Sequence, residues 1–153
     1  MILRLPGSGV QVTSGDSGSE TEVVVFDDRF DASTLHLLRE RVAACAAAAG
    51  MPHDRVADVI LAVHELAANV VSHGAGAGRL LIRAAAGALR CQVTDAAPGA
   101  GPWPVRKGHG LWIVRAVADE VTASLGPHGS QVTVLFGWRA GAPGPGHPSA
   151  QAT

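Results

Sequence analysis

The stretch that decides the fold is Leu61-Ala-Val-His-Glu-Leu-Ala-Ala-Asn-Val-Val-Ser-His-Gly74. It lies in a longer segment, about His53 to His73, whose apolar residues recur every three or four positions: Val56, Val59, Ile60, Val63, Ala67 and Val70. This spacing predicts an amphipathic helix with one packed face. Pro52 marks its start and Gly74 its end.

Two polar residues of this helix stand apart from its apolar stripe. Glu65 and Asn69 are four positions apart, so they project from the same helix face and can share a ligand. Asparagine is disfavoured inside helices, and its amide oxygen can coordinate a cation. A ligand site is therefore one interpretation of the pair. A plain solvated face is the other.

His64-Glu65 also resembles the beginning of a zinc protease motif, in which two histidines four residues apart hold the metal. Position 68 is alanine, so the second zinc ligand is missing. We therefore reject a metalloprotease.

The remaining elements are predicted from alternation, capping residues and turn signals. In chain order they are a strand at 21–26, an Ala-rich helix beginning after Asp31 or Ser33 and ending near Gly50, the 53–73 helix, strands at 79–85 and 89–94 joined at Ala86-Gly87, a helix from His109 to about Val121, and a strand at 130–136. This order predicts an α+β fold, a two-layer α/β sandwich with a mostly antiparallel sheet and helices on one face.

The two ends of the chain differ in composition from its middle. Residues 1–20 include a Gly- and Ser-rich run, and residues 139–153 are rich in Gly and Pro. Such segments bury too little apolar surface to order themselves. We therefore expect flexible ends around one domain at 21–138.

A second candidate site follows the strand at 89–94. Asp95 ends that strand, and the Pro- and Gly-rich segment 96–107 is predicted to be a loop that closes over a ligand. A buried Asp95 carboxylate could accept a hydrogen bond from an adenine amino group. Alternatively, Asp95 only starts a turn.

A third candidate is Gly108-His109-Gly110, which precedes a helix beginning at Leu111. Glycine-rich approaches to helix N-termini bind phosphate well. The alternative is a tight loop without a ligand.

Bulk properties exclude several classes of function. The 153 residues suffice for one domain, and the net charge of -1 gives no field that attracts nucleic acid or an acidic membrane. Cys45 and Cys91 lack the spacing of a zinc site or a disulfide framework, which favours reduced thiols. The sequence predicts neither a signal peptide nor a bilayer span, so we expect a cytoplasmic protein without membrane or direct nucleic-acid partners.

In order and spacing, the three candidate sites resemble the N, G1 and G2 boxes of the GHKL (Bergerat-fold, histidine-kinase-like) ATPase superfamily. The resemblance is greatest to its anti-sigma factor serine kinase branch and extends from about Thr21 to Trp138. The matching segments are Leu61 to Gly74, Val93-Thr-Asp-Ala-Ala-Pro-Gly99 and Lys107-Gly-His-Gly-Leu-Trp-Ile-Val114. The G1-like segment departs from the family pattern, because Ala97 stands where a glycine is usual.

The resemblance implies a role for each matching residue. Glu65 would be the general base and Asn69 the magnesium ligand, while Asp95 would recognise adenine. The remaining nucleotide-binding residues would be Gly99, Lys107, Gly108, Gly110, Leu111 and, after Gly129, Ser130. The segment Ala118 to Val121 would complete the helix that follows the G2 box.

The implied cofactors are ATP and Mg²⁺. The implied activity is that of a protein serine/threonine kinase, which phosphorylates a STAS-domain anti-anti-sigma protein and sequesters a sigma factor, and a homodimer is possible. Two alternatives remain: a switch protein that activates a partner phosphatase, and a degenerate ATP-binding module. The presence of both Glu65 and Asn69 argues against the degenerate module, because adenine binding alone needs no base.

Overall fold

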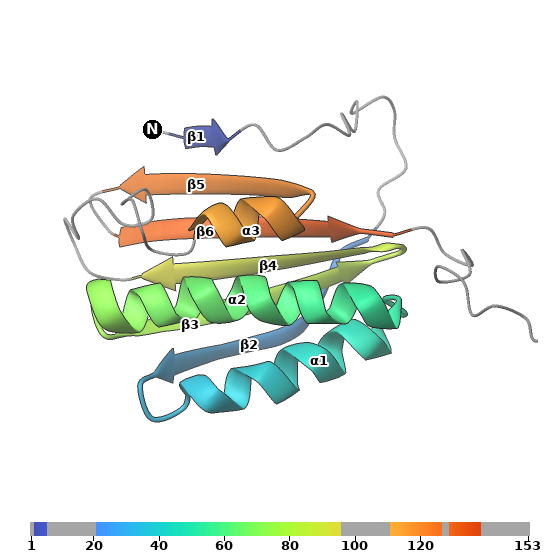
Figure 1. Cartoon of the computed structure of the whole chain (residues 1–153), viewed down its shortest axis with the longest axis horizontal. Helices are drawn as coiled ribbons and strands as arrows, with labels where there is room; N and C mark the ends of the chain where they lie inside the picture. Colours follow the sequence, from blue (N-terminus) through green and yellow to red (C-terminus); the bar gives the residue numbers. More distant parts are fainter. Residues whose placement is uncertain (1, 6–20, 96–110, 127–128, 139–153) are drawn as a thin grey trace, which may run out of the picture.

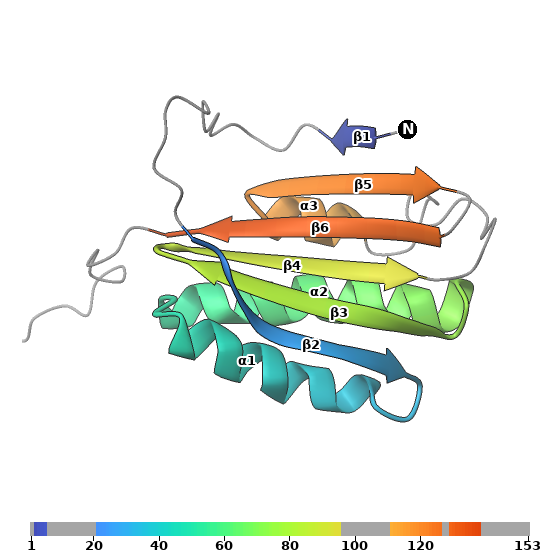
Figure 2. The ribbon, with the colours of Figure 1, turned by 180° about the vertical axis from the view of Figure 1, so that it is seen from behind.

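The structure is a computed structural model that describes residues 2–5, 21–95, 111–126 and 129–138. It has two layers, with one sheet and a set of helices that all cover the same face (Figures 1 and 2). None of the helices in the described part of the chain lies on the opposite face of the sheet. The predicted α+β sandwich is therefore confirmed.

The sheet has six strands in the order β1-β5-β6-β4-β3-β2, and each neighbouring pair is antiparallel. The strands are β1 (Ile2–Leu5), β2 (Val23–Asp31), β3 (Ala77–Ala85), β4 (Ala88–Asp95), β5 (Glu120–Gly126) and β6 (Gly129–Gly137). In β4 and β6, buried and half-buried residues alternate because one face of the sheet packs against the helices. The hydrophobic core lies between the two layers.

The helical layer consists of η1 (Leu35–Leu37), α1 (Leu38–Ala48), α2 (His53–His73) and α3 (Leu111–Val117). The bounds of α2 are those predicted from its periodicity. Of the predicted apolar stripe, Val59, Val63, Ala67 and Val70 are buried, and Val56 and Ile60 are half-buried. The buried face also includes Ala62, Leu66 and Asn69, which were not predicted to lie on it. Because α2 lies between α1 and α3 along the middle of the sheet (Figure 1), it carries residues to both ends of the domain.

One sequence expectation about α2 is wrong. An 18-residue window of α2 has a mean hydropathy of 1.3, so by length and composition this helix could cross a membrane. In the structure the buried residues of α2 pack on the sheet, which identifies α2 as a core helix.

The predicted hairpin between β3 and β4 is confirmed. Gly87 has φ +69°, a conformation that glycine adopts without a steric penalty. The backbone N–H of Trp138 donates to the Gly87 carbonyl at 2.8 Å, which ties the end of β6 to this turn.

The segment after α3 corrects the sequence analysis. The helix predicted to reach Val121 ends at Val117, and Glu120 begins a strand, β5, that was not predicted. Ala118 to Val121 therefore form the turn and the start of β5 and do not complete a helix. The physical reason is alternation: Val121 and Ala123 are buried, whereas Thr122 and Ser124 are half-buried.

The N-terminal region also differs from expectation. Residues 1–20 were expected to be flexible, but Ile2–Leu5 form β1, which pairs with β5 at one edge of the sheet. Four residues show too little alternation to be recognised as a strand. Residues 6–20 and 139–153 lie outside the described part of the chain.

The opposite edge of the sheet is β2, which is longer than the predicted strand. Its register against β3 shifts between Val24 and Phe26, which marks a β-bulge. Val23, Val24 and Val25 before this point are 57%, 52% and 42% exposed. After β2, Asp31 Oδ1 accepts hydrogen bonds from the backbone N–H groups of Ser33 and Thr34, which orders the turn before the helices. The prediction that Asp31 or Ser33 caps the Ala-rich helix is wrong, because the cap positions are Thr34 for η1 and Leu37 for α1.

Both cysteines are free, as expected. Burial raises the pKa of the Cys91 thiol in β4 and, to a lesser degree, that of Cys45 in α1.

Arg55 fastens the start of α2 to the rest of the fold. Its guanidinium donates to Asp58 at 3.0 Å, to the Val117 carbonyl at the end of α3 at 3.2 Å, and to Asp119 at 2.9 Å. The same Asp119 oxygen accepts the backbone N–H of Gly137 at 2.7 Å. The guanidinium also lies 5.4 Å from the centre of the Phe136 ring. We call this group, Arg55, Val117, Asp119, Phe136 and Gly137, the clamped end of the domain.

Candidate functional site

The candidate residues that the structure describes converge at the other end of the sheet. There α2 ends, β4 ends at Asp95 and β6 begins next to Ser130 (Figure 1). Asn69, Gly74, Asp95 and Ser130 belong to this group, which we call the site end. Residues far apart in the sequence are brought together because β4 and β6 are paired neighbours in the sheet.

Asp95 is the central residue of the site end. Its relative exposure is 0%, and it lies between Gly78 of β3 and Ser130 of β6 in the strand register. The backbone N–H of Ala75 donates to Asp95 Oδ1 at 3.2 Å. A carboxylate is costly to bury, so its place at a strand end in the core calls for a specific interaction. Asp95 is therefore not a residue of a simple surface turn, and its role in recognition stays a prediction.

Gly74 provides the space for this carboxylate. A Cβ on Gly74 would collide with Oδ2 and Cγ of Asp95 and lie 2.9 Å from the Val70 carbonyl oxygen. The Gly74 backbone has φ -105° and ψ -143°, which is outside the left-handed region. Its backbone conformation is therefore not the reason for a glycine at this position. Only a residue without a side chain lets the end of α2 come this close to Asp95. The sequence analysis treated Gly74 as a helix stop and missed this second role.

Ser130 lies directly across from Asp95 in the pairing of β4 with β6 and is 4% exposed. A buried hydroxyl and a buried carboxylate are therefore adjacent on neighbouring strands. Together they offer a donor and acceptors to a polar ring. This placement agrees with the position predicted for Ser130.

Asn69 and Glu65 occupy neighbouring turns of α2. Asn69 is 7% exposed, so it belongs to the buried residues of the helix and does not face solvent opposite the packed stripe, as the sequence analysis placed it. Glu65 is half-buried and makes no hydrogen bond or ion pair with the residues that the structure describes. The alternative of a plain solvated face does not hold for Asn69.

Leu111 is the first residue of α3 and packs against the hydrophobic core. The next residue, Trp112, is 70% exposed. The other predicted nucleotide-binding residues are Gly99, Lys107, Gly108 and Gly110, and they lie outside the described residues. Their positions relative to Asp95 stay predictions.

The side chains at the site end can be tested against the two expected cofactors. Within the described part of the chain no group of three His, Cys, Asp or Glu side chains could hold a metal ion. A single amide ligand such as Asn69 fits Mg²⁺, which binds through few protein ligands when phosphates and water supply the rest. The buried Asp95 carboxylate fits an amino group on a ring. The residues present are therefore compatible with a nucleotide and its magnesium ion.

The two-layer fold with a carboxylate buried at a strand end is compatible with a nucleotide-binding domain of the ATPase type. Residues 29–136 match the family described as histidine kinase-like ATPase domain. The chain belongs to this family. A comparison with curated protein sequences gave no significant match.

Among solved structures, the chain is similar to the RsbU and RsbW domains of Rv1364c from Mycobacterium tuberculosis. The TM-score is 0.57 at 21% sequence identity, and the match covers 72% of this chain. It covers 32% of the other chain, so this protein spans about a third of the length of that structure. At this identity the likeness concerns the fold.

Proposed function

We propose that this protein binds ATP with Mg²⁺ and acts as an anti-sigma regulatory factor with protein serine kinase activity. The observation that carries the proposal is the buried Asp95 carboxylate, enclosed by Gly74 and Ser130 at the end of the helix that bears Glu65 and Asn69. The family match and the three motif-like segments support the same activity.

Asp95 is proposed to select the base. A carboxylate only accepts hydrogen bonds, so it pairs with the amino group of adenine and is repelled by the carbonyl oxygen that guanine has at that position. Ser130 would add its hydroxyl on the neighbouring strand. ATP should therefore bind more tightly than GTP.

Asn69 is proposed to hold the magnesium ion. When bound, this ion neutralises and orients the phosphates of the nucleotide. Gly108 and Gly110 would donate backbone N–H groups to the phosphates before Leu111, and Lys107 would add positive charge. Gly99 would complete the nucleotide-binding loop after Asp95.

Glu65 is proposed to be the general base. Its carboxylate takes the proton of a substrate serine hydroxyl while that oxygen bonds to the γ-phosphorus. The bond from this phosphorus to the bridging oxygen breaks, and ADP leaves. Glu65 is suited to this role because it is half-buried and is not engaged by another described side chain.

The proposed substrate is a serine on a STAS-domain anti-anti-sigma protein, and the proposed second partner is a sigma factor. Support comes from the resemblance of the N, G1 and G2 boxes to the anti-sigma branch and from the similar fold of a structure that contains an RsbW domain. We place the activity in one domain at 21–138, in a cytoplasmic protein that can form a homodimer.

The deciding experiment is transfer of radiolabelled γ-phosphate to STAS-domain proteins encoded beside this one. Wild-type protein should label one serine, and Glu65→Gln should slow the transfer by about 10²- to 10⁴-fold, the range for a lost general base. Glu40→Gln is the matched control, because Glu40 is an exposed acid on α1. If a partner binds tightly but stays unlabelled, the kinase proposal fails and the phosphatase-activating switch replaces it.

A further inference from the structure

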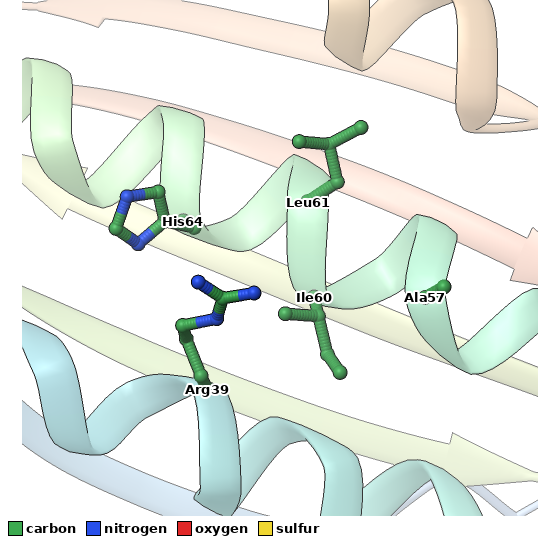
Figure 3. Close-up of a pocket in the computed structure, with 5 residues that line it drawn as sticks. All are labelled: Arg39, Ala57, Ile60, Leu61 and His64. Atoms are coloured by element: carbon green, nitrogen blue, oxygen red, sulfur yellow. The ribbon is translucent and has the colours of Figure 1, made fainter.

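A second cavity lies on the flank of α2 that faces α1. Its volume is about 310 Å³, and it is lined by Arg39 of α1 and by Ala57, Ile60, Leu61 and His64 of α2 (Figure 3). Glu65 follows His64 directly and lies four residues after Leu61, but neither Glu65 nor any other described residue proposed to bind the nucleotide lines this cavity. The cavity is therefore separate from the proposed nucleotide site.

Two nitrogen-bearing side chains, His64 and Arg39, line this cavity. His64 Nδ1 is buried and has no hydrogen-bond partner among the described residues. Arg39 is exposed and forms no ion pair or hydrogen bond within the described part of the chain. Figure 3 shows the Arg39 side chain extending from α1 toward α2, where the His64 ring lies. Buried polar groups normally have a hydrogen-bond partner. A ligand that accepts hydrogen bonds would therefore supply a partner for these two side chains.

The charge and shape of these groups specify the ligand chemistry. A guanidinium presents N–H donors in a planar fork that matches a carboxylate, and the imidazole can offer a third donor when Nδ1 is protonated. No acidic side chain lines the cavity. An anionic, planar acceptor therefore fits this cavity better than a cation or a neutral group.

The rest of the lining is apolar. Ala57, Ile60 and Leu61 supply methyl and methylene surface, and Leu61 is 39% exposed at the surface. A water molecule occupies about 30 Å³ in the liquid, so the cavity has room for on the order of ten non-hydrogen atoms. A strongly hydrated anion such as phosphate would leave this apolar surface uncovered, whereas an alkyl chain would cover it.

We propose that the α1–α2 cavity binds a small aliphatic monocarboxylate, with the carboxylate at Arg39 and His64 and the alkyl chain on Ala57, Ile60 and Leu61. This site does not depend on the proposed kinase activity. Because His64 and Glu65 are adjacent in α2, a molecule bound here contacts the helix that carries the proposed base.

The test is an NMR titration of the full chain with hexanoate, butanoate, hexanamide and inorganic phosphate. Hexanoate should give saturable shifts at Arg39 and His64. It should bind at least about tenfold more tightly than the neutral hexanamide, the gain expected from a charge-assisted hydrogen bond. Butanoate should bind more weakly by about two- to fourfold for each missing methylene that is buried.

Two variants locate the site. Arg39→Gln should weaken hexanoate binding by about tenfold without changing the thermal midpoint, because Arg39 makes no hydrogen bond or ion pair within the described part of the chain. Arg41→Gln is the matched control on the same helix; the Arg41 guanidinium lies 5.9 Å from the Phe26 ring centre instead. This variant should bind hexanoate as the wild type does.

Three results would overturn the proposal. The first is no saturable shift at Arg39 or His64 up to ~20 mM hexanoate, which is weaker than small ligands of this size usually bind to a formed pocket. The second is that hexanamide or phosphate binds as tightly as hexanoate. Equal binding of hexanamide would show that the carboxylate is not recognised, and equal binding of phosphate would show that the alkyl chain is not. The third is an equal loss in Arg41→Gln, which would indicate general attraction of anions to α1.

Discussion

The two ends of the domain each hold an aspartate, and their surroundings differ. At the clamped end, Asp119 pairs with the Arg55 guanidinium at 2.9 Å and is 47% exposed. At the site end, Asp95 is 0% exposed, accepts the Ala75 N–H and lies against Gly74. A half-exposed ion pair links parts of the fold at the clamped end, whereas a fully buried carboxylate packs against a glycine at the site end.

This difference indicates how one fold separates stability from binding. The clamped end uses a long, multiply bonded side chain, which links α2 with the end of α3 and, through Asp119, with the end of β6. The site end brings backbone and small residues close to a charge, an arrangement that does not stabilise the fold by itself. Substitutions at the two ends should therefore change different measurements.

The largest effect should come from the two aspartates themselves. Asp95→Asn should lower ATP affinity by about 10- to 100-fold, because a hydrogen bond to a charged group is worth more than a neutral one. Asp119→Asn should leave ATP affinity unchanged. Isothermal titration with ATP-Mg measures both. Equal losses in the two variants would remove the functional distinction between the ends.

The next effect is steric. Gly74→Ala should displace the Asp95 carboxylate, which lowers ATP affinity by about tenfold and the free energy of unfolding by about 1–3 kcal/mol, as for an overpacked site. Gly50→Ala is the control: Gly50 has φ +84° and no atom within 4 Å of an added Cβ. It should lose about 1 kcal/mol from backbone strain and keep its ATP affinity. Unaltered ATP binding in Gly74→Ala would show that the enclosure of Asp95 is unimportant.

At the clamped end, Arg55→Met should reduce the free energy of unfolding by about 1–2 kcal/mol, because several partly buried hydrogen bonds are lost while the apolar stem is kept. ATP affinity should stay within about twofold of the wild type, since the two ends are far enough apart to act independently. Urea denaturation checks the first expectation. Arg90→Met, which breaks a more exposed pair with Glu22, should cost less than about 0.5 kcal/mol. A similar loss of unfolding free energy in both variants would show that Arg55 does not have a special stabilising role at the clamped end.

The smallest effect concerns a carboxylate at neither end. Hydrogen bonds from Arg79, at 2.6 Å to each carboxylate oxygen, hold the pKa of Asp27 in β2 below its usual value of 3.8. A depressed pKa in the folded state adds stability above the unfolded value, and this stability is lost as the pH falls through the folded pKa, here below 3.8. Arg79→Gln should raise the Asp27 pKa in an NMR titration. The pKa of Asp31, lowered by Ser33 and Thr34, should not change. A parallel shift of both would point to a global change.

Local sequence signals predicted much of the fold. The bounds of α2 were predicted correctly because an apolar period, Pro52 and Gly74 all agree. The β3–β4 hairpin was predicted because its turn residue, Gly87, adopts a conformation that favours glycine. The strands β1 and β5 were missed because their pairing with distant segments, and not their own short patterns, identifies them.

Sequence patterns supplied the candidate residues of the proposed site but not the geometry that brings the described ones together. The opposition of Asp95 and Ser130 depends on the register of β4 against β6, which joins segments 35 positions apart in the sequence. The burial of Asn69 likewise depends on what packs beside α2. Gly74 shows the same limit of sequence-based prediction. The sequence alone does not distinguish a glycine that only ends a helix from one that also makes room for a carboxylate.

The exposed valines of β2 have a consequence for the protein in concentrated solution. An edge strand offers unpaired backbone groups, and a run such as Val23, Val24 and Val25 is a template on which other chains can add strands and aggregate. Two features of β2 oppose this: the bulge after Val24 interrupts the regular edge, and charges follow at Asp27, Asp28 and Arg29. The bulge and these charged side chains should therefore limit strand addition at the β2 edge.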